Sequence, residues 1–88
     1  MSNPTWSPDR LAELRLAKLR KDGKPWSQRD LGEAAFPHLS GVSARNKILR
    51  FETYPRGRNA TLPNAEDVCA LCEALGCTPD ELFGVEND

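Results

Sequence analysis

The 88-residue sequence has few of the residues from which active sites are usually built. It contains a single histidine, His38, so a Ser/His/Asp arrangement would depend on that residue, which lies in a proline-flanked loop. There is no glycine-rich phosphate loop and no segment that pairs two histidines with a glutamate at helical spacing. We therefore expect no enzymatic activity and no bound cofactor.

Long apolar runs are also absent. No stretch approaches the roughly 20 apolar residues that a membrane span needs. Residues 1–8 lack the basic start and apolar stretch of a secretory signal. These absences predict a cytoplasmic protein, and a chain of this length fits one domain with one modest core.

The three cysteines do not predict a disulfide or a metal site. An odd number of cysteines in a chain without a signal argues against a disulfide framework. Cys69 and Cys72 fall on the apolar stripe of a predicted helix, where a free cysteine acts as a small hydrophobe. Metal-binding pairs of this spacing usually lie in a turn, so we predict that Cys69, Cys72, Cys77 and His38 bind no zinc.

The basic residues are confined to one part of the sequence. All 12 lysines and arginines lie between Arg10 and Arg58, so residues 1–58 carry a net charge of +6 and residues 59–88 carry −7. The overall net charge of −1 hides this division. It predicts one face that binds a polyanion and another that turns away from it.

Start and stop signals divide the sequence into five predicted helices, and no strand signal is present. The first helix follows Ser7-Pro8, a capping hydroxyl and then a proline, and its inner stripe is expected at Ala12, Leu16 and Leu19. The predicted helices span residues 9–21, 28–35, 44–53, 65–75 and 79–83, the last four capped by Ser27, Ser43, Asn64 and Thr78.

Four motifs occur in order along the sequence: Ser27-Gln28, Ile48-x-x-Phe51-Glu52, Pro63-Asn64-Ala65-Glu66, and the segment from Leu71 to Leu82. Together they resemble the lambda-repressor-like (Cro/C1, Xre-type) helix-turn-helix family. The resemblance covers about residues 10–85 and implies an all-α, five-helix DNA-binding domain over residues 9–85. Residues 1–8 are then a flexible arm and residues 86–88 a tail, and the turn between helices two and three, at 35–43, is longer than is usual.

The resemblance implies that the third helix enters the major groove of double-stranded DNA and presents its first residues to base edges. Arginine can donate two hydrogen bonds to guanine, and asparagine can exchange two with adenine. We therefore predict direct readout by Arg45 and Asn46. The full set of predicted base contacts is Ser43, Ala44, Arg45, Asn46, Lys47 and Arg50.

Contacts to the DNA backbone are predicted at the first turn of the second helix, whose free amides attract phosphate, and in the loop after the third helix. The resemblance also suggests that Glu52 pairs with an arginine of the first helix, best matched by Arg20, as a structural ion pair. The predicted backbone contacts are Ser27, Gln28, Arg29, Arg56 and Arg58.

The function that the resemblance implies is a sequence-specific transcriptional regulator, a repressor of bacterial or phage origin associated with the nucleoid. It is expected to bind DNA as a homodimer and to need no small-molecule ligand. One alternative is a protein-binding module, such as an antitoxin-type partner, that acts through its acidic tail or through residues 3–7 with Trp6. Another is a nonspecific nucleoid binder. The residues suggested for the dimer interface are Leu75, Leu82, Phe83 and Val85.

Overall fold

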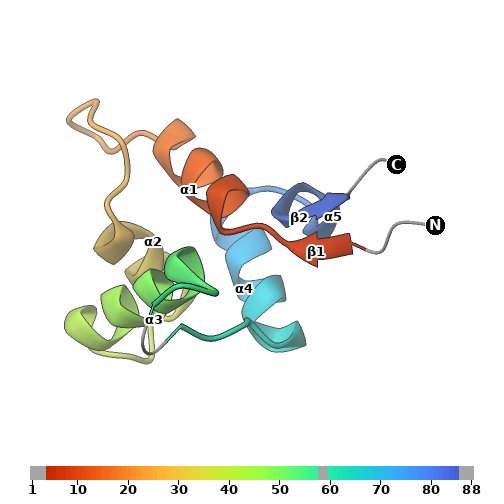
Figure 1. The fold of residues 1–88 in the computed structure, drawn as a ribbon. Coiled ribbons are helices and arrows are strands. Elements are labelled where there is room, and N and C mark those ends of the chain that lie inside the picture. Colours follow the sequence, from red (N-terminus) through yellow and green to blue (C-terminus); the bar gives the residue numbers. More distant parts are fainter. Residues whose placement is uncertain (1–3, 58–59, 86–88) are drawn as a thin grey trace.

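The computed structural model describes residues 4–57 and 60–85. The predicted backbone contact Arg58 and the predicted tail 86–88 lie outside these residues. Within them the chain is mostly helical with five helices, as the sequence predicts (Figure 1). The helices are α1 (Pro8–Ala17), α2 (Gln28–Ala35), α3 (Gly41–Thr53), α4 (Ala65–Leu75) and α5 (Pro79–Leu82). Two short strands accompany them: β1 (Pro4–Trp6) precedes α1, and β2 (Phe83–Val85) follows α5.

The N-terminal segment from residue 4 is part of the fold, which corrects the prediction of a flexible arm over residues 1–8. β1 pairs with β2 in antiparallel register, and Trp6 is 6% exposed. The Trp6 indole Nε1 donates a hydrogen bond of 3.0 Å to the carbonyl oxygen of Phe51, and its ring lies edge-on to Phe51 and Phe83. A three-residue strand that starts with proline has no alternation to detect, so the sequence carries no strand signal here.

α1 ends earlier than predicted and buries a different side. Leu11 is fully buried and Leu14 packs against the core, whereas Leu16 and Leu19 are 51% and 63% exposed. Residues spaced i, i+3 and i+4 share one side of a helix, and here these are Leu11, Leu14 and Arg15. Arg15 therefore lies on the inner side of α1, where the sequence pattern predicted Leu16 and Leu19.

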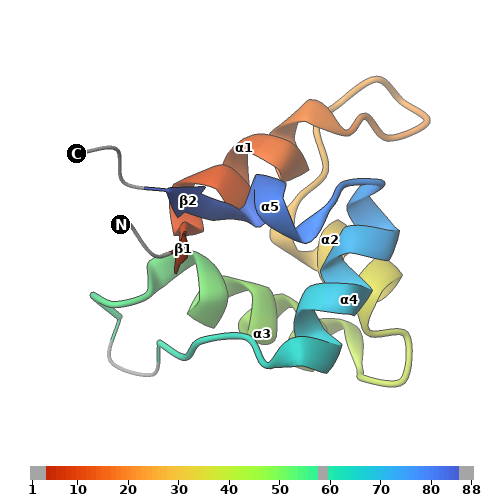
Figure 2. The ribbon, with the colours of Figure 1, turned by 90° about the vertical axis from the view of Figure 1, so that its right-hand side faces the viewer.

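The segment after α1 forms a hairpin where the sequence predicts the end of a helix. Leu19 and Pro25 form an antiparallel bridge, and the N–H of Arg20 donates to the carbonyl oxygen of Lys24 at 2.7 Å. Gly23 makes the turn with a φ of 85°, a conformation that favours glycine. Both ribbon views place this segment, residues 19–25, at the opposite end of the molecule from β1 and β2 (Figures 1 and 2). We call it the basic hairpin.

α3 begins earlier than predicted because Ser40, and not Ser43, caps it. The Ser40 Oγ accepts a hydrogen bond of 3.2 Å from the N–H of Ser43. The connection from α2 is therefore the five residues Phe36–Ser40, still longer than the three or four residues of a tight helix-turn-helix turn. Phe36 is buried in this connection and lies edge-on to Phe51. The longer connection is thus anchored to the core.

The remaining helix starts follow the sequence prediction. Ser27 caps α2 and Asn64 caps α4, each with an aspartate at the third position that completes a capping box. Gly76 ends α4 with a φ of 68°. On α4 Val68 and Leu75 are buried as predicted and Cys72 packs against the core, but Cys69 is exposed and Leu71 is fully buried in its place. The core comprises Trp6, Leu11, Leu31, Phe36, Ile48, Phe51, Val68, Leu71, Leu75 and Leu82.

Candidate nucleic-acid interface

The close packing of α2 on α3 fixes which side of α3 faces outward. Gly32 of α2 is buried, and a Cβ at this position would lie 2.6 Å from the backbone carbon and oxygen of Ala44. Glycine is therefore required for this approach. Ala44 is itself fully buried, so its side chain cannot reach a base and the prediction of a base contact at Ala44 is corrected.

The outward side of α3 carries most of the other predicted base contacts. Ala44, Ile48 and Phe51 are buried at the spacing i, i+4 and i+7, and they define the inner side of the helix. Residues about half a turn away therefore face solvent. The exposed side chains of α3 are Val42, Ser43, Arg45 and Arg50, and Asn46 is half-buried between them.

Two arginines on this side keep their charge available. Arg45 Nη1 donates a hydrogen bond of 3.2 Å to Asn46 Oδ1, so the two residues predicted to read bases already lie in contact. Neither Arg45 nor Arg50 forms an ion pair within residues 4–57 and 60–85. An exposed cation without a carboxylate partner attracts phosphate or a base-edge acceptor.

Lys47 has a structural contact instead. Its Nζ lies 3.1 Å from Asp67 Oδ1 at the start of α4 and 4.5 Å from the centre of the Phe36 ring. These contacts direct the Lys47 side chain away from the outward side of α3 and towards α4. Lys47 therefore links α3 to α4, and it can reach a base only if it releases Asp67.

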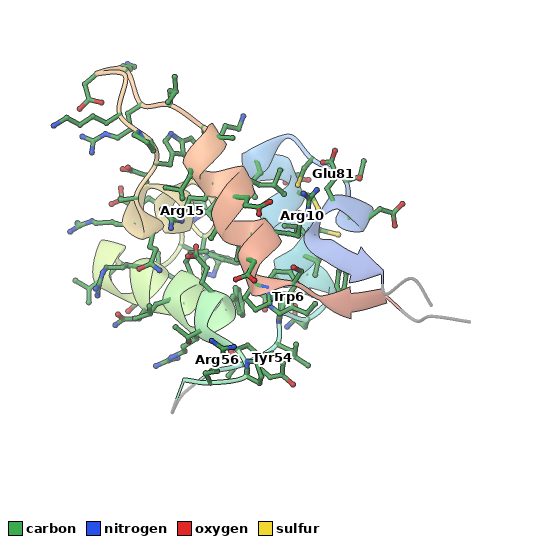
Figure 3. The ribbon with its side chains drawn as sticks, turned by 45° about the horizontal axis from the view of Figure 1, so that its top comes forward. Trp6, Arg10, Arg15, Tyr54, Arg56 and Glu81 are labelled. Atoms are coloured by element: carbon green, nitrogen blue, oxygen red, sulfur yellow. The ribbon has the colours of Figure 1, made fainter. Side chains whose placement is uncertain are left out.

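Gln28 and Glu52 belong to a partly buried cluster that joins the first three helices. Arg15 binds the Glu52 carboxylate through Nε at 2.8 Å and Nη2 at 3.1 Å, and Gln28 Nε2 donates to Glu52 Oε1 at 3.2 Å. Arg15 lies on the side of α1 that faces α2 and α3 (Figure 3). The predicted partner of Glu52, Arg20, was wrong. The Gln28 side chain is engaged here, which leaves the backbone amides of α2 as the donors for a phosphate.

The first turn of α2 has a capping box, which occupies the amide of Asp30. The N–H of Ser27 donates to Asp30 Oδ2 at 2.8 Å, and the N–H of Asp30 donates to Ser27 Oγ at 3.1 Å. The backbone hydrogen bond from Ser27 is the main reason that the pKa of Asp30 is lowered. The Ser27 hydroxyl therefore acts as a cap, and Asp30 stays ionised at neutral pH.

Arg29 and Arg56 flank the α3 face at its two ends. Arg29 forms an exposed ion pair of 2.7 Å with Glu33, and its guanidinium covers Gly41, where a Cβ would overlap it. Arg56 is exposed beside Tyr54 beyond the end of α3 and forms no ion pair within the described part of the chain (Figure 3). Both remain candidates for backbone contacts.

Val42 is a candidate contact that the sequence prediction missed. Its side chain is 60% exposed in the first turn of α3, one turn before Asn46 and on the same side. A helix capped by Ser43 would leave Val42 in the preceding loop. With Ser40 as the cap it faces outward, where an apolar side chain suits the methyl group of thymine.

The thiols of Cys72 and Cys77 are not activated. Burial raises the pKa of the Cys72 thiol to about 11 and raises that of Cys77, so both thiols are protonated at neutral pH and poorly nucleophilic. Within the described residues, no three or more His, Cys, Asp and Glu side chains are grouped to hold a metal ion. In the same part of the chain, no helix has the length and apolar character to cross a membrane.

Comparisons of the chain with family models, with curated proteins and with solved structures found no match. The function of the outward side of α3 and of the start of α2 therefore has to be argued from their residues and geometry.

Proposed function

We propose that the protein is a sequence-specific DNA-binding regulator of transcription, a repressor of bacterial or phage origin, with α3 in the major groove. The observation that supports this most directly is the outward side of α3. It carries two cations without ion-pair partners in the described residues, next to an asparagine and an exposed valine. The opposite side is packed closely against α2 at Gly32, which fixes the orientation of the outward side.

Each residue of this face has a chemical counterpart on a base edge. Arg45 can donate two hydrogen bonds to the O6 and N7 of guanine, and Asn46 can exchange two with adenine once it releases its bond to Arg45. Val42 suits a thymine methyl group. Arg29, Arg56 and the amides of α2 then hold phosphates on the strands that border the groove.

The proposal includes a homodimer on DNA. Two copies related by a two-fold axis would place their α3 helices about 34–36 Å apart, which matches half-sites one helical turn apart. Leu75 and Leu82 are buried in the core of one copy and are not available to a partner, which corrects their suggested role in the interface. Phe83 is half-buried against Trp6, and the side chain of Val85 lies outside the described residues.

The alternative of a protein-binding module loses one of its two supports. It depended on an exposed arm around Trp6 or on the acidic tail, and Trp6 is buried.

Selection of duplexes from a random pool, followed by fluorescence anisotropy, tests the proposed function. We expect an enriched inverted repeat that binds about 10³-fold or more tightly than bulk DNA. Failure to bind any duplex at low salt would contradict the proposal and direct attention to a protein partner. Enrichment of a single half-site would contradict the dimer alone.

Arg45→Ala is expected to weaken binding to the selected duplex by about 1–3 kcal/mol, because it removes a bidentate base contact. Binding to bulk DNA should change much less. Arg10→Ala is the matched control, since Arg10 is an exposed arginine on α1 that bonds to Glu13 and to the carbonyl of Glu81 (Figure 3). Equal losses for the two variants, or equal losses on both kinds of DNA, would contradict the assignment.

Val42→Ala is expected to make binding insensitive to one thymine methyl group. For the wild-type protein, replacing that thymine by uracil should weaken binding by about 0.8 kcal/mol, the value of one apolar carbon removed from water. For Val42→Ala the same replacement should have no effect. Leu62→Ala, at an exposed leucine in the loop before α4, is the control. Losses that simply add between Val42→Ala and uracil would show that the two groups do not touch.

A further inference from the structure

The basic hairpin is not part of the α3 surface, yet it carries a concentrated positive charge. Its seven residues include Arg20, Lys21 and Lys24, all exposed, and only one acid, Asp22. Such a cluster needs an explanation beyond solubility, because elsewhere on the described surface Arg10, Arg29 and Lys47 are each paired with a carboxylate.

The contacts inside the hairpin leave its two lysines uncompensated. Asp22 Oδ1 accepts a hydrogen bond of 3.0 Å from the backbone N–H of Lys24, and Asp22 Oδ2 lies 3.5 Å from Arg20. Arg20 also lies 3.8 Å from Asp30 at the start of α2. Among the described residues, Lys21 and Lys24 form no ion pair. The hairpin therefore presents two free ammonium groups.

The base of the hairpin is anchored to the helices. The N–H of Trp26 donates to the carbonyl oxygen of Lys18 at 3.0 Å, and Lys18 Nζ lies over the Trp26 ring. Arg15 Nη1 donates to the Trp26 carbonyl at 2.7 Å, which ties the hairpin base to the cluster around Glu52. Because α2 begins two residues after Trp26, the cations are held at a fixed place relative to the start of α2.

The position of the hairpin suits a long, negatively charged partner that also contacts α3. Figure 1 places the hairpin, α2 and the start of α3 along one side of the molecule, and in both views α2 lies between the hairpin and α3 (Figures 1 and 2). If the first turn of α3 lies against bases, the start of α2 faces the phosphates that border the groove. The hairpin then lies beyond α2, over phosphates outside the bases that α3 reads.

We infer that the basic hairpin is a second DNA-binding element, in which Lys21 and Lys24 contact backbone phosphates that flank the half-site. This inference rests on the proposed function and names a further part of the DNA that the protein holds. The contact is independent of sequence, because an ammonium group on a flexible stem is a point charge without the bidentate geometry that reads bases. The hairpin thus adds affinity, while α3 provides discrimination.

The double variant Lys21→Gln/Lys24→Gln tests the hairpin through the salt dependence of binding. Two lost phosphate contacts should reduce the slope of log K against log salt by about 1.8. The affinity should fall by the same factor on selected and bulk duplexes, so their ratio is unchanged. Lys21→Arg/Lys24→Arg keeps the charge and should retain the wild-type slope. A Gln variant with the wild-type slope would overturn the inference.

Ethylation interference locates the contact. With the wild-type protein, we expect interference at phosphates within the half-site and at a second group outside it. With the Gln variant, only the outer group should disappear, and an unchanged pattern would overturn the inference while the proposed function stands. A wild-type protein that selects no sequence would contradict the proposed function, but the hairpin would still be judged by the slope on bulk DNA. A wild-type protein that binds no DNA at all would overturn both.

Discussion

Glu52→Ala is expected to lower the free energy of unfolding by about 3–5 kcal/mol, because it leaves a largely buried arginine without its partner. The Arg15 and Glu52 side chains are 12% and 8% exposed, and they form two hydrogen bonds of 2.8 and 3.1 Å. Gln28 loses its acceptor in the same variant. Domains of this size are stable by roughly 0.05–0.15 kcal/mol per residue, so the loss takes a large part of the total. Urea unfolding followed by circular dichroism measures it.

Two further variants separate the pair from its surroundings. Arg20→Ala removes the arginine that the sequence suggested as the partner, and it should change stability by less than about 1 kcal/mol because its ion pairs are long and exposed. Replacing both partners, as Arg15→Met/Glu52→Leu, should recover much of the loss from Glu52→Ala. A larger loss for Arg20→Ala than for Glu52→Ala would contradict the observed pairing.

The arginine of α1 that reaches Glu52 could not be chosen from the sequence because the choice depends on where α1 ends. The expected helix over residues 9–21 includes Arg20, and its predicted inner side contains Leu16 and Leu19. The observed helix stops before the basic hairpin, so Arg20 leaves the helix and Arg15 lies inward beside Leu11 and Leu14. The end of α1 has a weak local signal, since Gly23 and Pro25 mark the turn of the hairpin and not the last helical residue.

Helix starts were predictable where one side chain could act as the cap. Ser27 and Asn64 each accept a hydrogen bond from an amide three residues on, and this interaction is local. At α3 two serines compete, Ser40 and Ser43, at the same local spacing. Tertiary packing favours Ser40, because α3 then begins before Ala44 and the first turn of the helix packs against Gly32.

The candidate interface shows the same division between local and distant causes. Composition and helical spacing were enough to predict that the third helix carries cations. Which of its residues face outward is determined by contacts with α2 and α4, and these could not be predicted from the sequence. Those contacts place Ala44 in the core, draw Lys47 to Asp67 and leave Val42 exposed.

Trp6→Ala is expected to lower the free energy of unfolding by about 3–5 kcal/mol, as for other large-to-small changes at buried aromatic residues. The indole fills the space between Phe51 and Phe83, and its N–H satisfies the Phe51 carbonyl near the end of α3. Trp6→Phe keeps most of the apolar area but leaves that carbonyl unpaired, so a smaller loss of about 1–3 kcal/mol is expected. Leu16→Ala, at an exposed leucine, is the control.

The same contacts decide how a deletion of residues 1–7 must be interpreted. A flexible arm without lysine or arginine could be deleted with both the unfolding transition and DNA binding unchanged. In the observed fold the deletion removes β1 and Trp6, so unfolding should occur at lower urea and DNA binding should be lost as a consequence. A truncated or Trp6→Ala protein with wild-type stability and weakened DNA binding would contradict the burial of Trp6. The unfolding midpoint therefore separates the two cases, because only the observed fold loses stability when residues 1–7 are removed.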